Sequence, residues 1–188
     1  MLSPIEQHIR KNLKHNITVN LMDGSLFGAA LGFASFSTIL PLFVASMTDS
    51  ATLIGLVPAI HSAGWLFPQL FTASHVSRLR QFKRTVLMMT IHERAPFLGF
   101  AFVALLIPIV GLQAGLVRTM LLLTWQGLGG GFTANAWTSM ISKIIPPDSR
   151  GTFFGLQAGM PNLFISASAI GAGYLLNALA SPWDFAVC

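Results

Sequence analysis

The sequence has few charged residues for its length. Asp, Glu, Lys and Arg together make up 9% of the 188 residues, whereas soluble domains average about 25%. Hydrophobic residues make up 53%, and the mean hydropathy is +0.67. A water-soluble core could not hide this much apolar surface in a chain of this length. We therefore expect an integral membrane protein.

Cysteine is almost absent, and so are the spacings that carry metal or nucleophile chemistry. The single cysteine, Cys188, is the last residue, which excludes a disulfide framework and a thiolate metal site within this chain. His92-Glu93 begins an H-E-x-x-H pattern, but Pro96 stands where the second histidine would be. No G-x-S-x-G motif occurs either. We expect no enzyme, no metal site and no cofactor.

The net charge of +5 could by itself indicate a nucleic-acid partner, but the placement of the positive charges favours a membrane. They lie in short segments between long apolar runs, and short segments rich in Lys and Arg stay on the cytoplasmic side. We therefore expect a multi-pass protein of the cell (plasma or inner) membrane and no nucleic-acid partner. Arg118 would lie outside and Arg94 within a span, whereas nine cations would be cytoplasmic: Arg10, Lys11, Lys14, Arg78, Arg80, Lys83, Arg84, Lys143 and Arg150.

The apolar runs predict the fold class: an all-α integral membrane bundle with a cytoplasmic amino terminus. Each run exceeds the roughly 20 residues needed to cross about 30 Å of hydrocarbon. Residues 1–16 form a polar amino-terminal segment, and residues 17–188 form the bundle. A sixth helix begins near Phe185, so we expect the bundle to be incomplete at its carboxyl end. The five full transmembrane helices are expected over residues 17–47, 51–73, 85–110, 116–141 and 151–180.

Two sets of glycines recur at a spacing of four residues, which places each set on one helix face. Small residues on one face let another helix approach closely. We expect both faces to pack against neighbouring helices. The first set is Gly24, Gly28 and Gly32, and the second is Gly151, Gly155 and Gly159.

Three segments resemble motifs of the amino-terminal half of the major facilitator superfamily of transporters. Residues 123–129 end in Q-G-L-G, similar to the R-x-x-Q-G-x-G pattern. Residues 146–155 resemble the P-x-x-x-R-G-x-x-x-G entry into a fifth helix, and the basic loop takes the place of G-x-x-x-D-R-x-G-R-R. The residues that match these motifs or lie in the basic loop, with an implied motif or gating role, are Arg78, Arg80, Lys83, Arg84, Gly127, Gly129, Arg150 and Gly151.

This resemblance implies transport of a small-molecule substrate by alternating access. This bundle would rock in the lipid bilayer against a carboxyl-terminal bundle of the same polypeptide, around a midplane site. That second bundle is missing from the sequence, so we expect no transport by this chain alone. Leu123 stands where the motif has an arginine associated with proton coupling. We therefore expect facilitated diffusion, or coupling through Asp23 or Glu93.

The charged residues inside the apolar runs have two interpretations each. Asp23 contacts a substrate or cation, or it neutralises Arg94 at comparable depth, which is our hypothesis for the pair. Glu93 is adjacent to Arg94, and neighbouring helical side chains diverge by about 100°. We expect Glu93 to turn toward the basic loop or His92, as part of a buried ion pair, a gating latch or a substrate site. His92 is a proton relay or a packing histidine.

Three residues of the fourth run, Gln126, Asn135 and Trp137, also have two interpretations. Amides beside an aromatic ring suit an uncharged or mixed polar and apolar substrate. Hydrogen bonds between helices are the alternative. A further set at four-residue spacing in the second run is expected to be a packing face: His61, Trp65 and Gln69.

Two other classes of protein compete with the transporter interpretation. An intramembrane enzyme or lipid-handling membrane protein would use Asp23, His92 and Glu93, and a structural membrane subunit would use none of them. An enzyme needs these side chains within about 3 Å of one another around a pocket. A transporter needs its polar side chains along a cavity wall.

Overall fold

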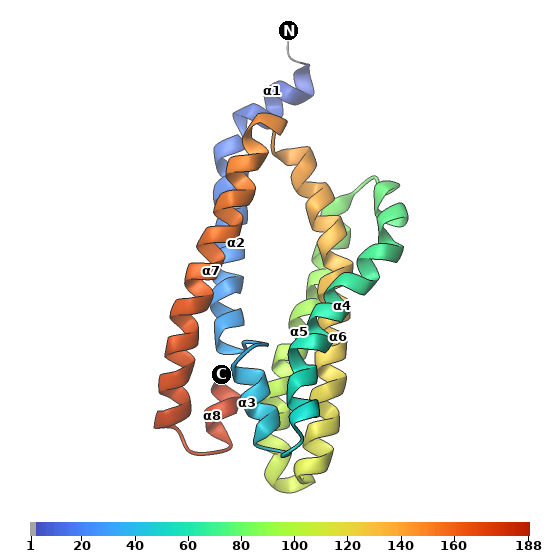
Figure 1. The fold of residues 1–188 in the computed structure, drawn as a ribbon. Coiled ribbons are helices and arrows are strands. Elements are labelled where there is room, and N and C mark those ends of the chain that lie inside the picture. The colour runs from blue at the N-terminus through green and yellow to red at the C-terminus, as the bar shows by residue number, and fades with distance from the viewer. Residues whose placement is uncertain (1–2) are drawn as a thin grey trace.

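The computed structural model describes residues 3–188, and this part of the chain is helical without any strand. Eight helices follow one another in the described residues (Figure 1). They are α1 (Pro4–Lys11), α2 (Leu13–Phe33), α3 (Ile39–Ala45), α4 (Ala51–Ser77), α5 (Phe82–Val110), α6 (Leu112–Ile144), α7 (Pro147–Ala178) and α8 (Trp183–Val187).

Local sequence explains several of the helix ends. The Ser3 side chain accepts from the Glu6 backbone N–H and Glu6 accepts from that of Ser3, which forms a capping box at α1. Ser50 caps α4 through the Leu53 backbone N–H. Between α5 and α6 the chain reverses at Gly111, whose φ of +84° is unfavourable for residues with a side chain.

The first predicted helix is wrong as a single element, because the chain breaks between α2 and α3. At the break the Ser35 carbonyl accepts from the Leu40 N–H at 2.9 Å, and the Ser35 and Ser37 hydroxyls lie 3.1 Å apart. Serine hydroxyls that bond locally compete with the helical ladder, which explains the break. Helices α4 to α7 follow the other predicted runs, and α8 lies where a sixth helix was expected.

The helices form two arms (Figure 1). Helices α2 and α7 lie side by side as one arm, and α4, α5 and α6 pack together as the other. At one end the connection from α6 to α7 joins the arms, and α1 precedes α2 at the same end. At the other end α3 packs against α4, and α8 packs against α5.

The first glycine face packs as predicted. A Cβ added at Gly28 would lie 2.7 Å from the Pro161 carbonyl oxygen, and one at Gly32 would lie 2.4 Å from the Ile165 carbonyl oxygen. Both contacts are with the backbone of α7, which cannot move aside like a side chain. These two glycines therefore allow the close approach of α2 and α7.

The second glycine face does not pack, which corrects the prediction. Within the described residues, nothing lies within 4 Å of a Cβ added at Gly151, Gly155 or Gly159. A four-residue spacing places glycines on one side of a helix but does not determine which side faces a neighbour. Helix α7 turns a different side toward α2, the one that carries Gln157, Pro161 and Ile165.

Apolar clusters occupy both ends of the second arm. One cluster lies near α3 and contains Phe43, Val57, Phe100 and Leu123. At the opposite end, Val76, Val86 and Ala136 form a second cluster, and Ile141, Ile145 and Phe153 form a third. Few residues of these clusters lie in the middle of the long helices.

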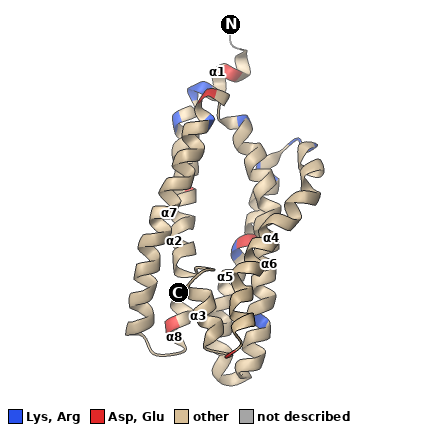
Figure 2. Ribbon diagram, in the orientation of Figure 1, with Lys and Arg blue, Asp and Glu red and all other residues tan. Residues whose placement is uncertain are grey.

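Two helices, α4 and α5, are long and apolar enough to cross a membrane. Large apolar side chains are exposed along both of them, including Leu70 at 76% and Ile109 at 80%. Lys and Arg residues gather toward the end that carries α1 (Figure 2), while Arg118 lies near the start of α6.

Candidate functional site

A cavity of about 540 Å³ lies between the two arms. All five long helices contribute to its wall. Its polar lining residues are His61 and Ser62 from α4, Glu93 from α5, Gln126 from α6 and Gln157 from α7, while α2 supplies glycine and apolar groups. The volume is within the range of sites that hold small molecules.

The cavity lies midway along the helices, between the apolar clusters at their ends. Along α4 the cluster residue Val57 is followed by the cavity residues His61, Ser62, Trp65 and Leu66 and then by Val76. Along α5 the order is Val86, Glu93 and Phe100. Polar side chains therefore meet in the middle of the helices, with apolar clusters nearer to both helix ends.

Glu93 is the one carboxylate among the described residues that line the cavity. The residue is 7% exposed. Its Oε1 lies 3.5 Å from the position that a Cβ of Gly130 would take, so the missing side chain at residue 130 leaves room for it. The Thr133 hydroxyl is also in contact with it. Within residues 3–188 no Lys, Arg or His forms an ion pair with Glu93.

His61 and Gln126 form a fixed polar pair on the cavity wall. His61 Nδ1 lies 2.9 Å from Gln126 Oε1, and Gln126 is 1% exposed. The His61 ring stacks on Phe36, with ring centroids 3.7 Å apart and planes 8° apart. Hydrogen bonding from one side and stacking from another hold the imidazole in place. His61 and Trp65 were expected to be packing residues. Both have packing contacts, with Phe36 and Gly130 respectively, and both also line the cavity.

Gln157 reaches the cavity from α7 because Gly24 of α2 has no side chain. A Cβ at residue 24 would lie 2.2 Å from Gln157 Nε2. Gln157 Oε1 is buried and has no hydrogen-bond partner within the described residues. A buried acceptor without a partner is uncommon and costly. The cavity therefore contains a free acceptor as well as a carboxylate.

Asp23 and Arg94 form the ion pair that the sequence analysis hypothesised. Arg94 Nη2 lies 3.0 Å from Asp23 Oδ1, and the Arg94 guanidinium lies 4.8 Å from the centre of the Phe27 ring. The Arg94 side chain is 45% exposed and the Asp23 side chain is 61% exposed. The pair joins α2 to α5 and so connects the arms.

The expected orientation of Glu93 toward the basic loop or His92 is wrong. Glu93 points into the cavity, and His92, on the other side of α5, is exposed with its ring centroid 6.3 Å from that of Trp125. The divergence of adjacent helical side chains explains the separation. No hydrogen bond in the described residues joins His92 to Glu93 or Asp23.

Two of the three candidates on α6 do not line the cavity. Asn135 Nδ2 donates to the Gln69 carbonyl at 2.8 Å and to Thr72 Oγ1 at 3.0 Å, so it joins α6 to α4. The ring of Trp137 packs near Phe153, with centroids 6.4 Å apart. Gln126 is the residue of the three that reaches the cavity.

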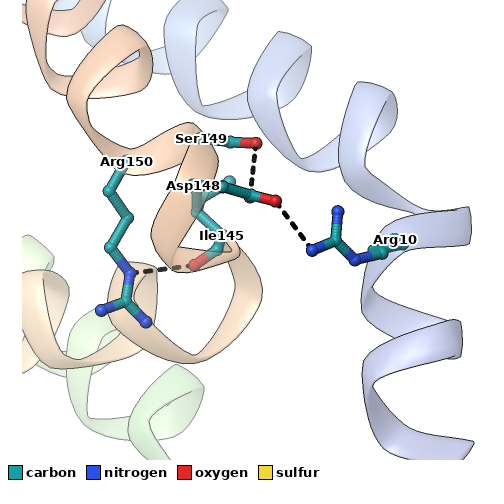
Figure 3. A network of polar contacts seen from close by, with 5 residues as sticks. All are labelled: Arg10, Ile145, Asp148, Ser149 and Arg150. Atoms are coloured by element: carbon teal, nitrogen blue, oxygen red, sulfur yellow. Dashed lines mark hydrogen bonds and ion pairs between the residues drawn. The ribbon is translucent and has the colours of Figure 1, made fainter. Parts of the chain in front are cut away.

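The motif residues have packing and capping contacts. A Cβ at Gly127 would lie 3.2 Å from Gly64 Cα, and one at Gly129 would lie 2.7 Å from the His92 carbonyl oxygen, so α6 packs closely on α4 and α5. Arg150 donates from Nε to the Ile145 carbonyl at 3.0 Å (Figure 3) and from Nη2 to the Ser142 carbonyl. Arginine thus satisfies carbonyls that the end of α6 leaves free.

Next to Arg150, the start of α7 is fixed to α1. Arg10 Nη2 lies 2.7 Å from Asp148 Oδ2, and the Ser149 hydroxyl donates to Asp148 Oδ1 at 3.1 Å (Figure 3). The hydrogen bond from Arg10, with that from Ser149, lowers the pKa of the Asp148 carboxyl below its ordinary value. No motif of the sequence analysis indicated this contact.

The basic residues between α4 and α5 are exposed. Arg78 forms the end of α4 and Arg80 lies in the connection, whereas Lys83 and Arg84 belong to the first turn of α5. Positive charge at a helix amino terminus is unfavourable for the helix dipole. The stability of α5 therefore does not explain why Lys83 and Arg84 lie in its first turn.

No sequence pattern indicated Gln157 as a site residue. The sequence shows only that Gly24 leaves space beside α2. Which side chain fills that space depends on the packing of α7 against α2. In the described residues no cluster of His, Cys, Asp and Glu could hold a metal ion. Comparisons with family models, with curated proteins and with solved structures found no match for this chain.

Proposed function

We propose that this chain is a multi-pass membrane bundle of a secondary transporter and that a small solute binds in the cavity between its arms. The observation that carries the proposal is the cavity itself. Polar side chains from four helices converge in the middle of long apolar helices, where ionisable groups are normally paired or functional.

Exposed apolar surface supports the membrane part of the proposal. In the most apolar stretch of α4, 11% of the residues are buried inside the protein, and in that of α5, 28%. A core helix of a soluble protein would be mostly buried, so these helices need an apolar environment outside the protein. The remaining long helices, α2, α6 and α7, would complete five spans of the cell membrane.

The gathering of cations at one end supports the proposed orientation. Short segments rich in Lys and Arg stay in the cytoplasm, and most cations of the chain lie at the end with α1 (Figure 2). The amino terminus would therefore be cytoplasmic. Asp49 and Asp184 would lie near the opposite face.

The resemblance to the major facilitator superfamily supports the mechanism of this proposal, alternating access against a second bundle. The open face of α7 at Gly151, Gly155 and Gly159 offers a surface where such a bundle could approach closely. The Asp23–Arg94 pair between the arms would stabilise one conformation. Breaking and remaking such contacts is how packed helices switch between two states.

Access of water to the cavity tests the proposal. Ser62 lines the cavity, so a cysteine there, in a Cys188→Ser background, should react with a small charged methanethiosulfonate added to the protein in nanodiscs. A cysteine at Leu70, which is 76% exposed on the outer face of α4, is the matched control and should not react with the charged reagent. Equal protection of both positions would show a cavity closed to water and would contradict a transport role.

A further inference from the structure

We propose that the ligand of the cavity between the arms is an organic cation, a protonated amine with an aromatic or other apolar body. The inference rests on the proposed function, because it names the class of solute that this cavity would hold. Its basis is the imbalance of charge and of hydrogen-bonding groups on the cavity wall.

The first observation is an acidic group that forms no ion pair within the described residues. Glu93 is 7% exposed and lines the cavity, and the described lining residues include no Lys or Arg. The adjacent Arg94 is already bound by Asp23 at 3.0 Å. A buried carboxylate that is ionised needs a positive partner, and in this cavity a bound ammonium group could supply it.

The second observation is a free acceptor from another helix. Gln157 Oε1 is buried and lacks a hydrogen-bond partner within the described residues. An ammonium group has three donors and no acceptor. It could therefore donate to Glu93 of α5 and to Gln157 of α7 together, which would also hold the two arms to one ligand.

The third observation is the apolar remainder of the wall. Trp65, Leu31 and Ile165 line the cavity beside these polar groups. Aromatic faces attract cations, and apolar groups bind the body of an amine. A wall with one carboxylate, an indole ring and no Lys or Arg among its described residues fits an amine better than an anion.

Three probes with the same naphthyl body separate charge from shape. They are 1-naphthylmethylamine, 1-naphthylmethanol and 1-naphthoate, which are cationic, neutral and anionic near pH 7. Binding to the whole chain in zwitterionic nanodiscs is measured by the anisotropy of naphthyl fluorescence, with empty nanodiscs subtracted. We expect the amine to bind at least about tenfold more tightly than the alcohol, because a charge-assisted hydrogen bond contributes this much, and the acid to bind most weakly.

Substitutions test whether Glu93 causes the preference for the cationic probe. Glu93→Gln keeps the shape of the side chain and should weaken amine binding by about ten- to a hundredfold while leaving binding of the alcohol nearly unchanged. Glu93→Asp keeps the charge and should retain the preference for the amine. Glu6→Gln is the matched control: it makes the same change at the only other glutamate of the sequence, in α1, outside the cavity. It should leave binding of all three probes unchanged.

The outcomes separate the two proposals. If the alcohol binds as tightly as the amine, Glu93 carries a proton rather than a charge, and the cation proposal is wrong. It is also wrong if Glu93→Gln keeps the preference, or if no probe binds while the cysteine at residue 62 reacts with the charged reagent. If that cysteine does not react, the transport proposal itself fails. Should Glu93→Gln not fold, the three probes on the unmodified chain and on Glu93→Asp still decide.

Discussion

At the scale of single residues, the placement of charge follows one geometric rule. Glu93 and Arg94 are neighbours on α5, and their side chains leave the helix about 100° apart. Arg94 therefore reaches Asp23 of α2, while Glu93 enters the cavity. One short segment thus supplies both a contact between the arms and a carboxylate for a ligand.

The Asp23–Arg94 pair should contribute measurably but modestly to stability. We expect Asp23→Ala and Arg94→Ala each to lower the temperature of unfolding. Because both side chains are about half exposed, the coupling energy in a double-mutant cycle should be about 1 kcal/mol or less. The charge-reversed double variant should recover part of the loss. Strictly additive losses would show that the two residues act separately.

The Arg10–Asp148 pair should make docking of α1 depend on pH. The pKa of Asp148 is lowered in the folded protein, so the contact is present above the ordinary carboxyl pKa of 3.8 and is lost as pH falls through the lower, folded value. The protection factors of the α1 amides, which are corrected for the intrinsic pH dependence of exchange, should therefore stay constant above pH 3.8 and fall only at lower pH.

Asp148→Asn should accelerate exchange in α1 at pH 7, because the amide cannot pair with Arg10 as the carboxylate does. Asp184→Asn, at the start of α8, makes the same change far from α1 and is the control. Unchanged exchange in α1 of the Asp148→Asn variant would mean that other contacts, such as that of Asn16 Nδ2 with the Ile144 carbonyl at 3.2 Å, hold this end together.

At the scale of helices, packing depends on which face of a helix lacks side chains. Helix α2 meets α7 through Gly28 and Gly32, and α6 meets α4 through Gly127. Helix α7 has an equally regular set of glycines, yet that face is open within the described residues. Small residues therefore permit close packing without determining where it occurs.

A pair of matched substitutions tests this difference. Gly28→Ala places a methyl group 2.7 Å from the Pro161 carbonyl oxygen, so α2 and α7 must separate and the unfolding temperature should fall. Gly155→Ala meets no described atom within 4 Å, and alanine favours a helix over glycine by about 0.5–1 kcal/mol. It should leave the unfolding temperature unchanged or raise it. Equal effects of the two changes would contradict the packing described for α2.

At the scale of the whole molecule, two arms enclose a cavity that lies between apolar clusters. The clusters are built from apolar side chains, whereas the cavity wall includes a carboxylate, two amides and an imidazole. Such a division suits a bundle whose arms move relative to each other around a bound solute. The contacts that would have to break include the Asp23–Arg94 ion pair and apolar contacts such as Phe27 with Phe97.

The proposed orientation in the membrane can be measured by labelling. In a Cys188→Ser background, a cysteine at Asp49 or Gln113 should react with an impermeant maleimide added to intact cells, because both positions lie at the end opposite α1. A cysteine at Arg80, in the basic connection between α4 and α5, should react only after the cells are opened. External labelling at residue 80 would overturn the orientation.

The sequence by itself determined the helical class and the approximate extent of most helices. Hydropathy and helix caps act through neighbouring residues, so α4 to α7 follow the predicted runs closely. It also supported the pairing of Asp23 with Arg94, since opposite charges at similar depth in apolar runs need a partner. The break between α2 and α3 was missed because local hydroxyl bonding opposed a strong apolar signal.

Only the tertiary structure decided which side chains share the cavity. Hydropathy changes little around these helices, so the sequence could not determine the rotation of each helix about its axis. That rotation turns Glu93 inward and His92 outward, directs Asn135 to α4, and leaves Gly155 open. Gln157 enters the site because α7 packs against α2 at a glycine, a contact between residues more than a hundred positions apart that no local pattern encodes.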